Sequence, residues 1–172
     1  MKNLKPTLNQ PLTWIFKKKK IILQSGTETI IELIEEKQSK ASFRLDGEKF
    51  TIRNKGFWNA KTIIEKEGEQ LLMLKRNFLG SKGVIEFENG NHYSCKISNS
   101  PLAKLSFFNK DEKEILYYQL EATPKPKTVL NIIDHSTNEK ELLMLIILGC
   151  YSFKGIVREN DTSNLIVLAA GA

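Results

Sequence analysis

We predict that this sequence forms a mainly β (α+β) fold, an antiparallel barrel of about 12 strands that encloses one hydrophobic C-terminal helix. Three observations predict it. Segments rich in β-branched and aromatic residues alternate with turn residues every 8 to 12 positions or so, a spacing typical of sandwiches and barrels. Two dipeptides suit tight hairpins, and one stretch near the C-terminus is apolar on every side. The 172 residues, 41% hydrophobic and 27% charged, fit one globular domain over 1–172.

The two hairpins are the clearest local signals in the sequence. Asp46-Gly47 and Asn89-Gly90 each lie between β-prone runs, and both dipeptides tolerate the positive φ that a two-residue turn demands. The runs that they join are 43–45 and 50–52 in the first hairpin, and 84–88 and 92–97 in the second. We therefore expect both pairs of runs to form antiparallel strands.

An internal repeat extends these hairpins. A shift of 43 residues aligns Gly47 with Gly90 and Phe50 with Tyr93, and the matches continue beyond the turns. The runs that follow are 62–66 and 71–75 in the first copy, and 105–109 and 114–118 in the second. The pattern predicts a duplicated unit of about four strands. With the runs 12–23, 29–35 and 127–133 added, we expect about 11 or 12 strands.

The amino-acid composition of the chain changes after Asp134. Asn138 is a typical helix cap with a carboxylate, Glu141, three residues on, and seven apolar residues follow at Leu142–Leu148. Leu and Met favour a helix over a strand, although a fully buried central strand is the alternative interpretation. At about 100° per residue, seven consecutive positions face every direction, so this helix has no polar side. The helix, expected at 138–154, must be surrounded, and a closed sheet can surround it.

Three segments carry a family resemblance. They are the hairpin Val84–Ile97, the aromatic-led strand Gly56–Lys61 and the apolar run Glu141–Gly149. Together with the predicted architecture they resemble the superfamily of tubby C-terminal domains, phospholipid scramblases and plant LURP-one-related proteins. The resemblance implies a barrel around a C-terminal helix. Tubby domains bind phosphoinositide headgroups, so by analogy the resemblance also implies lipid binding. The basic motif of tubby domains matches no stretch here, and Leu165–Ala170 is an addition, expected as a last strand or a docked extension.

The charge of +6 is concentrated at the amino end. The first 27 residues hold six lysines and no Asp or Glu, so the rest of the chain is neutral. Four of these lysines are consecutive and follow Trp14 closely, and each basic charge beside an anionic membrane contributes about 1 kcal/mol. The predicted anionic-lipid site therefore consists of Trp14, Lys17, Lys18, Lys19 and Lys20. The alternative interpretation of the lysine run is a solvated turn or a protected edge strand.

The sequence carries no enzyme signature that we can identify. The three residue types of a hydrolase triad are adjacent in Asp134-His135-Ser136, whereas real triads are assembled from distant positions, so a loop before the helix is expected here. His92 and Cys95 are too few for a tetrahedral metal site, and Gly80-Ser81-Lys82-Gly83 lacks the spacing of a phosphate loop. We expect a non-enzymatic protein with no cofactor and no catalytic or metal site. We do not expect nucleic acid as a partner, because the basic residues are confined to one short stretch.

Location and partners follow from the same features. Polar residues and two prolines interrupt residues 6–11, where a secretory signal would need an apolar stretch, and Leu142–Phe153 is too short to cross a bilayer. With two cysteines expected to be reduced, the sequence predicts a cytoplasmic protein, peripheral at the membrane, with residues 1–11 as a basic arm. The expected partner is an acidic phospholipid surface or a protein. The alternative function is a carrier of a small apolar ligand or lipid, and the oligomeric state stays open.

Overall fold

The computed structural model describes residues 12–17, 19–37, 39–45, 47–56, 60–77, 79–99, 101–121 and 127–170. Side chains are described as far as Lys154, except those of Phe16 and Lys127. The predicted basic arm, residues 1–11, and Lys18 of the predicted lipid site lie outside the described residues.

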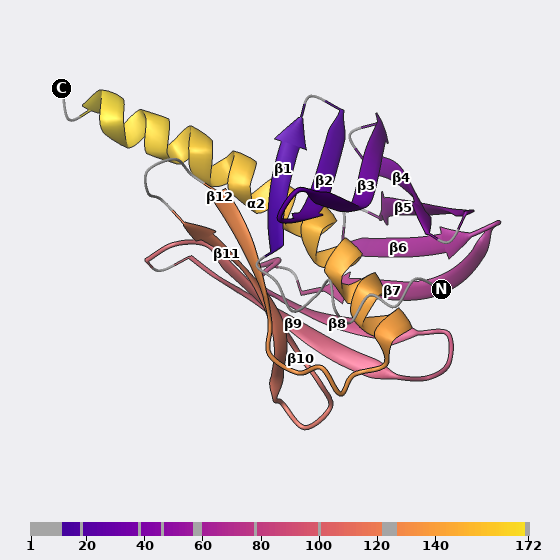
Figure 1. Cartoon of the computed structure of the whole chain (residues 1–172). Coiled ribbons are helices and arrows are strands. Elements are labelled where there is room, and N and C mark those ends of the chain that lie inside the picture. The colour runs from indigo at the N-terminus through magenta and orange to yellow at the C-terminus, as the bar shows by residue number, and fades with distance from the viewer. Residues whose placement is uncertain are drawn as a thin grey trace.

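The described residues form a closed barrel of antiparallel strands, which confirms the predicted fold class (Figure 1). Each strand pairs with its neighbours in the sequence, and β1 pairs with β12 to close the barrel through Leu12 opposite Leu130. The strands are β1 (Leu12–Lys17), β2 (Lys20–Ser25), β3 (Glu28–Lys37), β4 (Lys40–Leu45), β5 (Glu48–Lys55), β6 (Lys61–Lys66), β7 (Glu69–Arg76), β8 (Lys82–Phe87), β9 (His92–Ser98), β10 (Lys104–Phe108), β11 (Glu114–Glu121) and β12 (Lys127–Ile132). One helix, α2 (Glu139–Ala170), follows β12.

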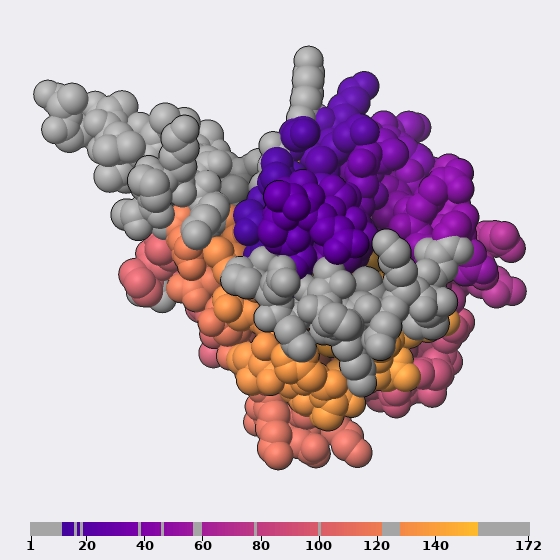
Figure 2. Space-filling model, in the orientation of Figure 1, coloured from indigo at the N-terminus to yellow at the C-terminus, as the bar shows by residue number. Residues whose placement is uncertain are grey.

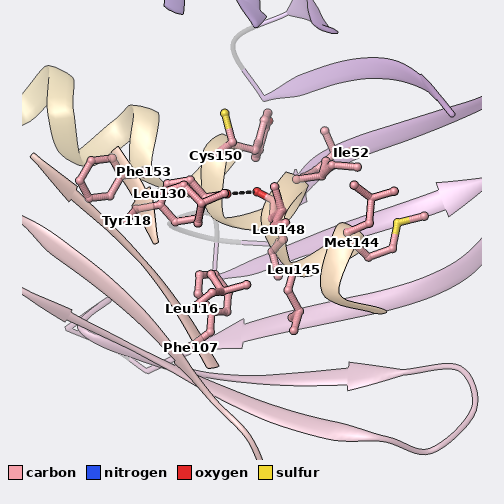
Figure 3. Close-up of a cluster of buried hydrophobic side chains, with 14 of the residues drawn as sticks. Ile52, Phe107, Leu116, Tyr118, Leu130, Met144, Leu145, Leu148, Cys150 and Phe153 are labelled. Carbon is pink, nitrogen blue, oxygen red and sulfur yellow. Dashed lines mark hydrogen bonds between the residues drawn. The ribbon is translucent and has the colours of Figure 1, made fainter. Parts of the chain in front are cut away.

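The first part of α2 lies inside the barrel, as the apolar run predicted. Every side chain from Leu142 to Leu148 is buried, and those of Leu145, Ile146, Ile147 and Leu148 are 0% exposed. Figure 1 shows the helix passing through the ring of strands, and Figure 3 shows its side chains packed against residues of the sheet such as Ile52, Leu116 and Leu130. The space-filling view in Figure 2 shows the indigo N-terminal strands beside orange residues of β12, where pairing of β1 with β12 closes the barrel.

The helix approaches the sheet tightly at Gly149. A Cβ atom placed on Gly149 would lie 2.2 Å from Cε2 of Tyr118 and 3.0 Å from Cε2 of Phe107, so only glycine lets the helix reach these rings. The Tyr118 hydroxyl donates a hydrogen bond to the carbonyl of Ile146, drawn as the dashed line in Figure 3. Phe153 packs beside the same ring, with centroids 5.9 Å apart. Tyr118 therefore anchors the helix to β11 by shape and by one buried hydrogen bond.

Two local predictions need correction. The segment Gly56–Lys61 was expected as a strand, but β6 begins only at Lys61, Gly56 and Ala60 lie outside the strands, and Phe57, Trp58 and Asn59 lie outside the described residues. The helix runs to Ala170 rather than ending near 154, so the backbone of Leu165–Ala170 is helical and adds no strand.

Both predicted hairpins form, with different turns. Leu45 pairs directly with Glu48, so the first connection has two residues, and Gly47 has a φ of 84°. The second connection spans 88–91: the Gly90 amide donates to the carbonyl of Phe87, and the Phe87 amide donates to the carbonyl of Asn91. This turn is longer than predicted, and Gly90 supplies its left-handed residue at a φ of 85°. Shifted by 43 residues, β4–β7 fall within two residues of β8–β11, in line with the predicted repeat.

Candidate functional site

Trp14 does not belong to a surface site, and this part of the prediction is wrong. Its side chain is 3% exposed and its ring lies 6.2 Å from that of Tyr118 in the core. The reason is the alternation of a strand, since Leu12 and Trp14 point to the same side of β1 and that side is the interior. The period of two residues in 12–14 was the signal that could have placed Trp14 correctly.

The lysines that follow Trp14 form the tip of the hairpin between β1 and β2. Lys17 ends β1 and pairs with Lys20, the first residue of β2, and Lys19 lies in the turn between them. The side chains of all three are exposed, and the Lys20 ammonium lies 2.6 Å from a carboxylate oxygen of Glu32. The geometry is that of a solvated turn, which places cationic side chains at one end of the barrel.

The connections of the barrel alternate between its two ends because every strand runs antiparallel to the next. One end holds the connections β1–β2, β3–β4, β5–β6, β7–β8, β9–β10 and β11–β12. We call this the basic end. Among the connection residues and the strand residues that flank them, the described basic side chains are Lys17, Lys19, Lys20, Lys37, Lys40, Lys55, Lys61, Arg76, Lys82 and Lys104, and the described acidic one is Glu121.

The opposite end, which we call the acidic end, holds the other connections and the loop that leads into α2. By the same criterion its described acidic side chains are Glu28, Glu48, Glu67, Glu69, Glu88, Asp111, Glu112, Glu114, Asp134 and Glu139, and its lysines are Lys66, Lys110 and Lys113. Charge is therefore sorted by barrel end. The lysines beyond Lys20 were not predicted as part of the site, although assigning alternate turns to alternate ends would have grouped them.

An apolar side chain accompanies the lysines of the basic end. Leu79 lies in the connection between β7 and β8 and is 80% exposed. The connection is held by its own backbone, since the Gly80 amide donates to the carbonyl of Asn77 and the Asn77 amide donates to that of Lys82. Leu79 is thus an exposed apolar side chain between basic residues, as was predicted for Trp14.

Buried polar contacts fix α2 inside the barrel at the basic end. The Arg76 guanidinium of β7 donates hydrogen bonds to the hydroxyl of Ser152, at 2.8 Å, and to that of Thr62, at 3.0 Å. Burial lowers the pKa of Arg76. Lys154 forms an ion pair with Glu35 of β3, and both side chains are largely shielded from water. These groups belong to the packing of the helix.

The acidic end fixes the start of α2 with a buried carboxylate. Glu141, 5% exposed, accepts hydrogen bonds from Asn89 and Asn91, each at 2.7 Å, and from the Tyr93 hydroxyl at 2.5 Å. Burial opposes the charge of Glu141, but the three donors outweigh it and lower the pKa of its carboxyl. Burial and the neighbouring carboxylate raise the pKa of Tyr93. Asn138 caps the helix by accepting from the amide of Lys140 at 3.0 Å.

The residues with catalytic potential are engaged locally. The Asp134 carboxylate accepts from the amide and the hydroxyl of Ser136, at 2.8 and 2.6 Å, and these bonds lower its pKa. Both thiols are buried, and burial raises the pKa of Cys95 to about 11 and that of Cys150 as well. Within the described residues, no group of three or more His, Cys, Asp or Glu is placed to hold a metal ion. The exposed charges of the two ends are what the arrangement offers to a partner.

Comparisons with protein-family models, with curated proteins and with solved structures gave no match. The resemblance to the tubby superfamily therefore stays a prediction. None of the described helices has the length and apolar character needed to cross a bilayer.

Proposed function

We propose that this protein binds an anionic membrane surface with the basic end of its barrel. The observation that carries the proposal is the sorting of charged turns, with lysines at one end and carboxylates at the other. An anionic surface attracts the first end and repels the second, so it both binds and orients the barrel. Screening over about 8 Å at physiological ionic strength confines the interaction to the end that faces the surface.

Leu79 supports a membrane as the occupant rather than a soluble polyanion. An exposed leucine at the tip of a turn gains about 1.5 to 3 kcal/mol on full transfer out of water, and lipid interfaces accept such side chains beside lysines. An acidic protein surface offers the lysines the same charge, so a protein partner remains the second outcome of the test. A carrier function would need space in the interior of the barrel, and the buried side chains of Leu142–Leu148 of α2 occupy the interior along their length.

The test is sedimentation with vesicles of phosphatidylcholine, with and without about one-third phosphatidylserine, at low and moderate salt. We expect binding to the acidic vesicles alone, weakened by salt. Replacing Lys17, Lys19 and Lys20 by Gln removes three charges at about 1 kcal/mol each, so binding should weaken about 100-fold. Leu79→Ser should weaken it about 10-fold through the lost apolar contact.

The matched control replaces the three lysines of the acidic end, Lys66, Lys110 and Lys113, by Gln. This triple variant has the same net charge as the first, so equal losses in both would mean that net charge acts and the basic end does not. Binding that survives in the control and is lost in the first variant supports the proposed orientation. The proposal would be overturned if the unchanged protein does not sediment with acidic vesicles.

A further inference from the structure

A groove of about 690 Å³ runs along the outer wall of the barrel over β7, β8, β9 and β10. Leu74 and Ile85 point into the core, so their neighbours Lys75 and Val84 point outward. Val84 lies opposite Ser94 of β9, and Ser94 lies opposite Phe108 of β10, so this row of outward-pointing side chains continues across the neighbouring strands. The lining residues are Lys75, Arg76, Asn77, Lys82, Gly83, Val84, Ser94, Cys95, Lys96, Phe108 and Glu112.

Gly83 of β8 is one of the lining residues and is tightly packed. A Cβ atom on Gly83 would lie 2.5 Å from Cδ1 of Leu74, 3.0 Å from Sγ of Cys95 and 3.1 Å from the carbonyl oxygen of Lys75. The absence of a side chain at Gly83 therefore lets the backbone of β8 lie close to Leu74, Cys95 and Lys75.

Two lysines meet at the end of the groove near the basic end. Lys82 and Lys96 are direct partners in the register of β8 and β9, so their side chains leave the same face side by side. Both are exposed, and neither forms an ion pair with a carboxylate among the described residues. Like charges in this position destabilise a sheet. An anion seated between the two ammonium groups would relieve that repulsion.

The floor of the groove is apolar and its far end is acidic. Val84, 49% exposed, and the half-buried Phe108 flank the hydroxyl of Ser94. Glu112 lines the groove from the connection between β10 and β11, which belongs to the acidic end. A ligand with an anionic head and an apolar body fits in one orientation, with the head at Lys82 and Lys96 and the body over Val84 and Phe108.

We infer that this groove binds a single-chain amphiphile with a carboxylate or phosphate head group. Its volume falls within the range of about 300 to 1,000 Å³ that is typical of small-molecule sites. The site lies on the wall and shares Arg76 and Lys82 with the basic end, but it takes one ligand molecule rather than a membrane surface. Lys17, Lys19 and Lys20 do not line the groove, so their replacement separates this site from the proposed membrane function.

The probes are dodecanoate and dodecyl phosphate, each below its critical micelle concentration, titrated by calorimetry and by amide NMR spectra. We expect one-to-one binding and the largest amide shifts at Gly83, Val84, Ser94 and Lys96. The tighter of the two probes identifies the preferred head group. Dodecyltrimethylammonium and inorganic phosphate should bind at least about 10-fold more weakly, because each lacks one half of the recognised chemistry.

The double variant Lys82→Gln/Lys96→Gln should weaken binding of the probes at least about 10-fold, and Val84→Ser about 3-fold. The matched control, Lys110→Gln/Lys113→Gln, removes two lysines of the acidic end and should bind like the unchanged protein. Thermal unfolding of each variant verifies that the fold is intact.

Three results with the amphiphiles would overturn the inference. They are equal binding of the cationic amphiphile, equal loss in the control variant, and amide shifts confined to residues outside the groove. Binding of an acidic peptide such as hexaglutamate in place of the amphiphiles would also overturn it, in favour of a protein partner. Replacing Lys17, Lys19 and Lys20 by Gln should leave probe binding unchanged, so failure here and failure of membrane docking are separable.

Discussion

The two ends of the barrel are built from the same kind of element and differ in charge. At both ends short connections join antiparallel strands, yet lysines occupy one set of turns and carboxylates the other. Most exposed turn positions accept either charge with little effect on folding, since surface substitutions usually change stability by less than about 0.5 kcal/mol. A sorted distribution over many such positions is therefore not required for folding, and it is the feature on which the proposed function rests.

The buried contacts of α2 show a second difference between the ends. At the acidic end one carboxylate, Glu141, is held by neutral donors from the β8–β9 hairpin. At the basic end two cations, Arg76 and Lys154, are held by hydroxyls and by Glu35. The acidic end thus holds α2 by a carboxylate among neutral donors, and the basic end holds it by cations, one of them paired with a carboxylate. The predictions that follow test how much each of these contacts stabilises the enclosed helix.

The largest effect is expected at the ion pair of the basic end. Glu35→Gln removes the countercharge of the largely buried Lys154, and breaking a buried pair costs about 3 kcal/mol or more. Urea denaturation at neutral pH measures the free energy of unfolding. The double variant Glu35→Leu/Lys154→Met should recover part of the loss, because it removes both charges. A single variant that is as stable as the unchanged protein would show that the pair does not hold the helix.

A smaller effect is expected in the middle of the helix. Gly149→Ala forces a methyl group against the Tyr118 ring, where a Cβ would lie only 2.2 Å away, and overpacking of this kind costs about 1 to 3 kcal/mol. The obstacle at Gly83 is the flexible tip of Leu74, so Gly83→Ala should cost less. If Gly149→Ala stabilises the protein, as helix propensity alone would predict, the tight contact with β11 is refuted.

The acidic end should respond to pH through Glu141. Its folded pKa lies below the ordinary value of 4.5, so its contribution to stability is full above that value and is lost as the pH falls through the folded pKa. Glu141→Gln should cost about 1.5 to 3 kcal/mol at neutral pH, because three donors lose a charged acceptor.

The same comparison repeated in acid isolates this carboxylate from the others. The difference in unfolding free energy between Glu141→Gln and the unchanged protein should shrink as the pH falls below 4.5. A difference that stays constant down to the pH of acid unfolding would assign the role of Glu141 to shape rather than charge.

The smallest effect on stability is expected for the exposed lysines of the basic end. Replacing Lys17, Lys19 and Lys20 by Gln removes one exposed ion pair, that of Lys20 with Glu32, and should change the free energy of unfolding by less than about 0.5 kcal/mol. The same variant is expected to lose most of its binding to acidic vesicles. A large loss of stability instead would mean that these lysines serve the fold.

The sequence predicted the architecture well because the decisive signal is one of composition. Leu142–Leu148 leaves a helix no polar side, and the structure buries that run completely inside closed sheet. Turn chemistry located the hairpins, since Gly47 and Gly90 both adopt a positive φ. The length of the second turn was wrong because the dipeptide specifies where the chain reverses but not which backbone hydrogen bonds close the turn.

The candidate site was predicted only in part. Lys17, Lys19 and Lys20 are exposed as expected, whereas Trp14 lies in the core. The predicted site consisted of residues that are adjacent in the sequence. It therefore included Trp14 with the lysines and did not include Leu79 and Lys82. In the barrel, adjacent residues of a strand face opposite sides and alternate turns meet at one end.

By itself, then, the sequence determined that a helix must be enclosed and that strands enclose it, since burial of apolar surface depends on composition and not on distant partners. The tertiary structure alone decided which charges share an end, that Gly83 packs closely against Leu74 and Cys95, and that Lys82 lies beside Lys96. Those juxtapositions are set by strand register and barrel closure, and they join residues through space that no local pattern connects.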